Sequence, residues 1–158
     1  MAPPRWLADE MLGRLARYLR FVGCDTLYVR DVSDDEIVAR AGAEGRVVLT
    51  RDRELARRAP GAFWVASPHL PDQWRAVRAA WPDVPAELSY ERCPICNGTL
   101  GRYAPGTDPV REAGLPTERV RAGLEVWACS ACGQLYWEGS HAAHIRARLA
   151  AWSGAAPA

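Results

Sequence analysis

The chain has 158 residues, of which 49% are apolar, and its net charge is +1 from 20 basic and 19 acidic residues. This apolar content excludes wholesale disorder, and the length fits one domain of ordinary size with a small addition. The charge balance excludes a protein that is held to nucleic acid by bulk charge alone. Any binding of nucleic acid must therefore be local.

No apolar segment approaches the roughly 20 residues that span a bilayer. The opening sequence MAPPRWLADE lacks the charged and apolar regions of a signal peptide. We therefore expect a cytoplasmic protein without a membrane partner. Four of the five cysteines form two C-x-x-C pairs, which in such a compartment indicate a metal site rather than disulfides.

Residues 5–81 alternate between strand and helix patterns. Short apolar, β-branched runs predict strands at 5–9, 25–29, 46–50 and 61–66. Helical spacing of apolar residues predicts helices at 10–23, 33–45, 51–59 and 71–81. Repeated β-α units of this length predict an α/β fold, a parallel sheet with helices on its faces.

The composition changes near residue 85, where prolines replace periodic apolar residues. We place a first unit at residues 1–85 and a second unit at residues 86–158. The second unit holds both cysteine pairs, an inserted loop at 104–123 and a C-terminal helix at 139–152, for which Ser140 is the expected cap.

Acidic residues follow three of the predicted strands. Asp9 ends the first strand and Asp52 follows the third. The acids between the second strand and its helix are Asp31, Asp34, Asp35 and Glu36. Ligands of an open α/β sheet gather at the carboxyl ends of its strands, so three β-α junctions bring acid to one edge.

Clustered carboxylates repel one another unless a cation neutralises them, and hard oxygen ligands suit Mg²⁺ or Mn²⁺. Such an ion can activate water for attack on a phosphodiester. We expect Asp9, Asp34 and Asp52 to bind it and to be catalytic. Each of them also stands where a helix N-cap would stand, and for any one alone capping is the stronger interpretation.

Arginines line the predicted first helix opposite its leucines. Arg14, which is nearest the start of the helix, is the expected ligand of a substrate phosphate. Arg17 and Arg20 fit a solvated helix face at least as well.

The two knuckles CPICNG and CSACGQ each present two thiolates from a tight turn, which together make a tetrahedral four-sulfur zinc site. Its ligands are Cys93, Cys96, Cys129 and Cys132. Four thiolates fill the coordination sphere, so this zinc is expected to be structural. His141 and His144 then rank as surface or RNA-contacting residues, and Trp127, Tyr136 and Trp137 as packing residues of a small module.

The segments LADEMLGRLARYLRFVGCDTLYVRD, DDEI, VVLTRDREL, CPICNG and CSACGQLYWEGSH, taken together, resemble the Mut-seven C-terminal RNase family. This family is a PIN-like nuclease domain with an appended zinc ribbon, and the order of motifs agrees from Trp6 to His141. The resemblance implies a PIN-like α/β fold, an acidic site for a divalent metal and cleavage of RNA.

The resemblance also implies roles for single residues. Asp9 matches the acid after the first strand. The DDEI acids match the second acidic position, with Asp34 the first choice and Asp35 and Glu36 the alternatives. Asp52 matches the acid of the threonine-x-aspartate motif, with Glu54 beside it. Glu10 departs from the pattern, which has a small or amide residue there, and could add a ligand.

The leading interpretation is therefore a metal-dependent ribonuclease whose zinc ribbon aids RNA binding. The alternative is a non-catalytic RNA-binding module, associated with ribosomes or tRNA, in which the acids only cap helices.

Overall fold

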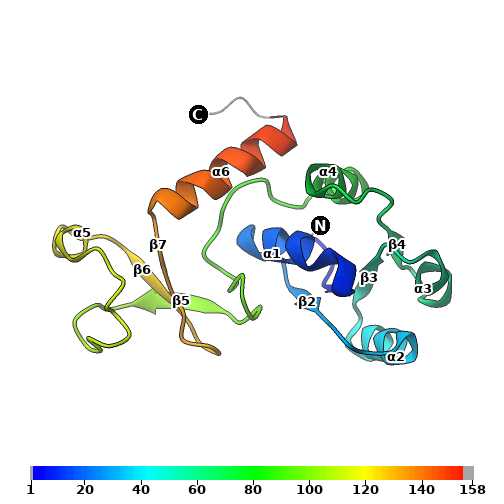
Figure 1. Ribbon diagram of the computed structural model, residues 1–158, viewed down its shortest axis with the longest axis horizontal. Helices are drawn as coiled ribbons and strands as arrows, with labels where there is room; N and C mark the ends of the chain where they lie inside the picture. Colours follow the sequence, from blue (N-terminus) through cyan, green and yellow to red (C-terminus); the bar gives the residue numbers. More distant parts are fainter. Residues whose placement is uncertain (1, 155–158) are drawn as a thin grey trace.

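The computed structural model describes residues 2–154 and contains two sheets (Figure 1). The larger sheet is parallel, with strand order β2-β1-β3-β4, and helices flank it. The smaller sheet is antiparallel, with order β5-β6-β7, and lies at the other end of the molecule. The predicted α/β class, with a small ribbon after the parallel sheet, is confirmed.

The parallel sheet uses the four predicted strands, which are β1 (Trp6–Ala8), β2 (Thr26–Tyr28), β3 (Val47–Thr50) and β4 (Phe63–Trp64). Trp6 aligns with Thr26 on one side and with Val47 on the other. The central strand β1 is buried along its whole length, as expected for a strand that is covered on both faces.

The helices that flank this sheet are η1 (Glu10–Leu12, a 3₁₀ turn), α1 (Gly13–Phe21), α2 (Asp34–Glu44), α3 (Arg53–Arg58) and α4 (Leu70–Ala80). Ser33 is the N-cap of α2, and Gly45 ends this helix in the left-handed conformation at φ 62°. The predicted first helix thus begins as a 3₁₀ turn, and the predicted last strand of the sheet contains only two residues.

The second unit contains β5 (Leu100–Tyr103), α5 (Thr117–Arg121), β6 (Val126–Cys129), β7 (Leu135–Trp137) and α6 (Ser140–Ser153). The expected capping role of Ser140 is wrong. Gly139 is the N-cap of α6, no side chain caps this end, and Ser140 is the first helical residue. None of the helices in residues 2–154 is long and apolar enough to cross a membrane.

Two apolar clusters lie on opposite faces of the parallel sheet, because successive side chains of a strand point to opposite faces. Trp6 belongs to the cluster under α1 and α4, and its neighbour Leu7 belongs to the cluster under α2 and α3. Helix α6 crosses from the small sheet to α4 (Figure 1) and buries Ile145 and Leu149 in the first cluster. The division at residue 85 stays a prediction, and α6 completes the core of the first unit.

Candidate functional site

An acidic pocket of about 110 Å³ lies where β1, β2 and β3 end. Its acidic lining residues are Asp9, Glu10, Asp31, Asp34 and Asp52. Its apolar lining comes from Met11, Val29, Val32, Ile37 and Leu55. Acids from three separate β-α junctions therefore do meet at one edge of the sheet.

Asp9 is the buried member of this group, with 6% of its surface exposed. Its Oδ1 accepts a hydrogen bond from the N–H of Met11 at 3.1 Å, and its Oδ2 accepts a hydrogen bond from the hydroxyl of Thr50. Burial raises the pKa of Asp9 above its ordinary value, the two hydrogen bonds lower it, and the charges of Asp52 and Glu10 raise it further. The two hydrogen bonds thus hold the Asp9 carboxylate in one position, while burial disfavours its charged form.

Asp52 is exposed and caps α3. Its Oδ1 accepts hydrogen bonds from the N–H groups of Glu54 at 2.7 Å and Leu55 at 3.2 Å. The threonine of the motif orders this turn, because Thr50 Oγ1 accepts a hydrogen bond from the N–H of Asp52 at 2.9 Å. The Thr50 hydroxyl therefore donates a hydrogen bond to the Asp9 carboxylate and accepts one from the N–H of Asp52. The cap engages one carboxylate oxygen of Asp52, so capping and facing the pocket are compatible.

Of the three alternatives at the second acidic position, Asp34 lines the pocket and the other two do not. Asp35 pairs instead with Arg58, which also lies 3.4 Å from Asp34 Oδ2. The Glu36 carboxylate accepts hydrogen bonds from both the N–H and the hydroxyl of Ser33, each at 2.9 Å, in a capping box.

Asp31 follows the second strand and is not among the ligands expected from the sequence. Its backbone is left-handed, with φ 56°, a conformation that aspartate tolerates better than most residues. This conformation places Asp31 in the lining of the acidic pocket. Only its position after a strand could have signalled this role in the sequence.

The carboxylates are near one another without forming a ready coordination sphere. Among residues 2–154, the four clustered cysteines are the only group of three or more His, Cys, Asp or Glu side chains whose ligand atoms lie close enough together to hold an ion. The donor set of the pocket is nonetheless the set of hard oxygens that Mg²⁺ and Mn²⁺ prefer. Mutual repulsion keeps such carboxylates apart when no cation neutralises them.

The four cysteines of the two knuckles form a compact cluster, in which all the sulfur atoms lie within 4.8 Å of one another. Burial works against ionisation of Cys129, but N–H groups of Cys132 and Ala131 donate to its sulfur and bring the pKa below its ordinary value. Tyr136 places its hydroxyl 3.0 Å from the sulfur of Cys93. Four thiols in this arrangement fit a structural zinc ion.

The turns around the cluster require particular residues. A Cβ atom at Gly98 would lie 2.7 Å from the sulfur of Cys129, so a side chain there would displace a ligand. Gly133 follows the second pair in the left-handed conformation, with φ 78°. Trp127 stacks on Tyr90 with ring centroids 3.9 Å apart, in keeping with the packing role predicted for it.

A family model described as the Mut7-C RNAse domain matches residues 4–149. The chain belongs to this family. The searches of curated proteins and of solved structures each found no match. Membership suggests a nuclease-type function with RNA as the substrate, and the match covers both the acidic pocket and the cysteine cluster of this Mut7-C domain.

Arg14 does not line the acidic pocket of the Mut7-C domain. It lines a separate groove between α1 and α6, together with Arg17, His141, His144 and Arg148. The basic residue beside the acids is instead Arg58, from α3. Arg14 is exposed on α1, one turn beyond Glu10, which does line the acidic pocket.

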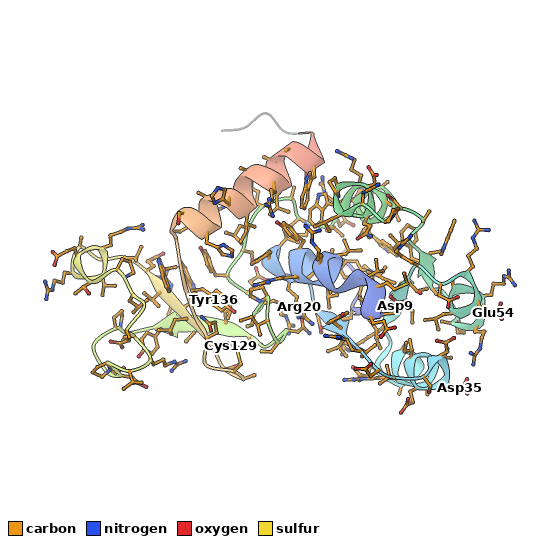
Figure 2. The ribbon with its side chains drawn as sticks, viewed as in Figure 1. Asp9, Arg20, Asp35, Glu54, Cys129 and Tyr136 are labelled. Carbon is orange, nitrogen blue, oxygen red and sulfur yellow. The ribbon has the colours of Figure 1, made fainter. Side chains whose placement is uncertain are left out.

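The solvated face proposed for Arg20 is wrong, because 6% of this residue is exposed. Its guanidinium donates to the carbonyl oxygens of Thr26, at 2.8 Å, and of Pro94 and Ile95, at 3.2 and 3.0 Å. In Figure 2, Arg20 lies between Asp9 and Cys129. The first cysteine knuckle is thus fastened to the amino end of β2, at the edge of the sheet opposite the acidic pocket.

Proposed function

We propose that the chain is a divalent-metal-dependent ribonuclease that hydrolyses RNA phosphodiesters at the acidic pocket. The observation that carries this proposal is the meeting of Asp9, Asp34 and Asp52 in one pocket, each from a different β-α junction. Family membership supports the reaction type. Asp31 and Glu10 line the same pocket and are further candidate ligands.

A bound Mg²⁺ or Mn²⁺ ion would supply the activation of water and the neutralisation of charge that develops on the phosphodiester. The chain's own part is to orient the oxygens. Thr50 fixes the carboxylate of Asp9, and the start of α3 fixes one oxygen of Asp52. Arg58 lies beside Asp34 and offsets part of the negative charge of this edge.

The cysteine cluster has a different role in this proposal. We propose that Cys93, Cys96, Cys129 and Cys132 bind one structural zinc ion, which holds the second unit together and keeps it on the first. The cluster and the acidic pocket have no residue in common, and Figure 2 shows Cys129 and Asp9 in different parts of the molecule, which supports separate structural and catalytic metals. The second unit would then add RNA affinity, and the first would supply the chemistry.

The test is cleavage of single-stranded and structured RNA by the purified protein with Mn²⁺, with Mg²⁺ and with neither. We expect cleavage that depends on the added ion and falls at least a hundredfold in Asp9→Asn, Asp34→Asn and Asp52→Asn. Asp35→Asn is the matched control, because this neighbour of Asp34 pairs with Arg58 outside the pocket lining. Parental rates in all three pocket variants would contradict the proposal.

One observation favours the alternative of a non-catalytic RNA-binding module. Asp9 and Asp52 both accept hydrogen bonds from backbone N–H groups at helix starts, as pure caps would. The two functions differ in the same experiment. A module of this kind would bind RNA and leave it intact with every divalent ion.

A further inference from the structure

A groove of about 350 Å³ runs between α1 and α6, apart from the acidic pocket. Cationic and imidazole side chains dominate its lining, which consists of Arg14, Arg17, Tyr18, Phe21, His141, His144, Ile145 and Arg148. No acidic residue is among these lining residues, although the whole chain has almost as many acids as bases. The groove is therefore a local concentration of positive charge on an otherwise balanced protein.

The arginines of this groove are available to a ligand. No ion pair in the described part of the chain involves Arg14, Arg17 or Arg148. Six of the ten other arginines in the described helices pair with an acid, namely Arg40, Arg57, Arg58, Arg75, Arg121 and Arg146. Arg148 donates to the hydroxyl of Tyr18 at 3.2 Å, and Arg17 lies 5.9 Å from the ring centre of Phe21. These neutral contacts position the two guanidinium groups without neutralising their charge.

The groove opens into a cavity of about 340 Å³ between α1, α6 and the zinc ribbon. The two spaces share Arg17, Phe21, His141 and Ile145. The remaining lining is largely apolar and aromatic, and includes Leu88, Tyr90, Leu135, Tyr136 and Trp137. A space of this size and lining suits a planar heterocycle, and aromatic side chains next to arginine are typical of sites for unpaired bases.

The other end of the groove lies near the acidic pocket. Arg14 belongs to the first turn of α1, and Glu10, four residues earlier, lines that pocket. Glu10 lies in the 3₁₀ turn that precedes α1, and four residues rise about 6 Å in an α-helix and about 8 Å in a 3₁₀ helix, which is comparable to one nucleotide step of an extended strand. A strand that follows α1 would thus run from the ribbon to the acids.

We propose that this groove and the adjoining cavity form one binding site for single-stranded RNA. Phosphates would contact Arg14, Arg17 and Arg148, and one base would enter the cavity beside the ribbon. The proposal rests on the proposed ribonuclease function and names the path of its substrate. In this proposal the ribbon forms one wall of the cavity that binds the base.

The first test is the affinity for a short, labelled, single-stranded oligoribonucleotide, measured by fluorescence anisotropy at several salt concentrations without added divalent ion. Arg17→Gln/Arg148→Gln should bind roughly tenfold to a hundredfold more weakly and show a smaller salt slope, by about 0.7 for each lost phosphate contact. Arg40→Gln is the matched control, since it removes one exposed arginine from α2, far from the groove.

The second test compares this oligoribonucleotide with one of equal length that lacks a base at one position. If a base occupies the cavity, a missing base at one register should weaken binding by the parent protein about tenfold. Parental affinity in Arg17→Gln/Arg148→Gln would overturn the proposal. Equal binding of the complete and base-lacking strands at every register would overturn it as well.

Binding and cleavage are separate measurements, so the failures of the two proposals are distinguishable. A protein that binds RNA through the groove and cuts none with Mn²⁺ would contradict the ribonuclease while the binding site stands. A protein that cuts RNA, and whose groove variant binds and cuts it at parental levels, would contradict the binding site while the ribonuclease stands.

Discussion

The guanidinium of Arg20, in the first helix, lies 3.0 Å from the carbonyl oxygen of Ile95, which belongs to the first cysteine knuckle. A second link is parallel to it, because Asn97 accepts from the N–H of Thr26 at 3.0 Å and donates to Asp25 at 2.8 Å. Polar contacts thus bind the first knuckle both to the end of α1, through Arg20, and to the start of β2, through Thr26. Such contacts fix a position because an unmade buried hydrogen bond is expensive.

We predict that Arg20→Gln lowers the free energy of unfolding by about 2–3 kcal/mol, because buried carbonyls of Thr26, Pro94 and Ile95 lose their donor. In a protein of this size that corresponds to a fall in Tm of roughly 5–10 °C. Differential scanning calorimetry of the zinc-loaded protein would measure it. Arg17→Gln, on the exposed side of the same helix, is the control and should leave Tm within a degree or two; an equal fall in both variants would contradict the prediction.

A second prediction concerns the stability of the folded protein at low pH. Burial disfavours the charge of Asp25, but hydrogen bonds from Arg46 and Asn97 outweigh burial and hold its pKa at about 2. Because this pKa lies below the ordinary value of aspartate, the stabilisation is present above about pH 4. It is lost as the pH falls through about 2.

The expected result is that parental stability declines between about pH 4 and pH 2 more steeply than that of Asp25→Asn, which cannot titrate. Near neutral pH the variant should be the less stable protein, because Arg46 loses one of its two carboxylate partners, Asp25 at 2.8 Å, and keeps only Glu44. Urea unfolding at a series of pH values measures both effects. Parallel pH profiles would contradict the prediction.

The fold could be predicted from the sequence because each element carries its own periodic pattern. Strand and helix runs alternate, and glycine or proline follows several of the helices, so element order and sheet type follow from local features. The one weak strand, β4, is the short edge strand of the sheet. The packing of α6 on the first unit was not predicted, since a helix pattern shows that a face is apolar and not what it covers.

The meeting of the acids in one pocket could be predicted from the sequence for the same reason, because the ends of parallel strands converge. The surroundings of the side chains could not. Arg14, Arg17 and Arg20 are three residues apart, and each step of three rotates about 60° backwards around a helix. Arg20 therefore turns toward the interior, where it meets a knuckle whose sequence lies more than 70 residues away. Long-range contacts of this kind leave no mark in local periodicity.

We predict one zinc ion per chain, bound by the four clustered cysteines, and a different behaviour for the fifth cysteine. Burial raises the pKa of Cys24 to about 12, so its thiol should not react with a disulfide reagent at pH 8 while the protein is folded. Removal of zinc should expose four reactive thiols, and a denaturant should add the fifth. Elemental analysis with thiol titration measures this order. A parent protein that is folded as purified but contains no zinc, or a Cys24 that reacts in the native state, would contradict it.

Asp52 has two roles in our proposals, a cap and a metal ligand, and two substitutions separate them. Asparagine keeps the oxygen that accepts from Glu54 and Leu55, so Asp52→Asn should change stability by less than about 0.5 kcal/mol. Asp52→Ala should lose about 1 kcal/mol. Both variants should lose RNA cleavage, measured as a rate with Mn²⁺, and both should lose stabilisation by Mn²⁺, measured as a thermal shift. An Asp52→Asn protein that cuts at the parental rate would leave Asp52 as a cap alone.

The last prediction concerns Asp9, whose buried carboxylate is unfavourable in the absence of a cation. Burial raises its pKa in the folded protein, so the folded state retains a proton that the unfolded chain releases at lower pH. This contribution to stability is complete below the ordinary pKa of aspartate and is lost as the pH rises through the raised value. Asp9→Asn should therefore be more stable than the parent at neutral pH without divalent ions, by about 1 kcal/mol or 2–4 °C in Tm.

Added Mn²⁺ should reverse this order, because the ion stabilises the parent and finds one ligand fewer in the variant. Thermal shift with and without Mn²⁺, at pH 5 and pH 8, measures both signs. Asp35→Asn is the control, as an exposed aspartate paired with Arg58, and it should gain no stability in either condition. An Asp9→Asn variant that is less stable than the parent without the ion would contradict this prediction. The buried charge of Asp9 would then carry no net cost, and the hydrogen bonds from Thr50 and Met11 would hold Asp9 as an ordinary cap.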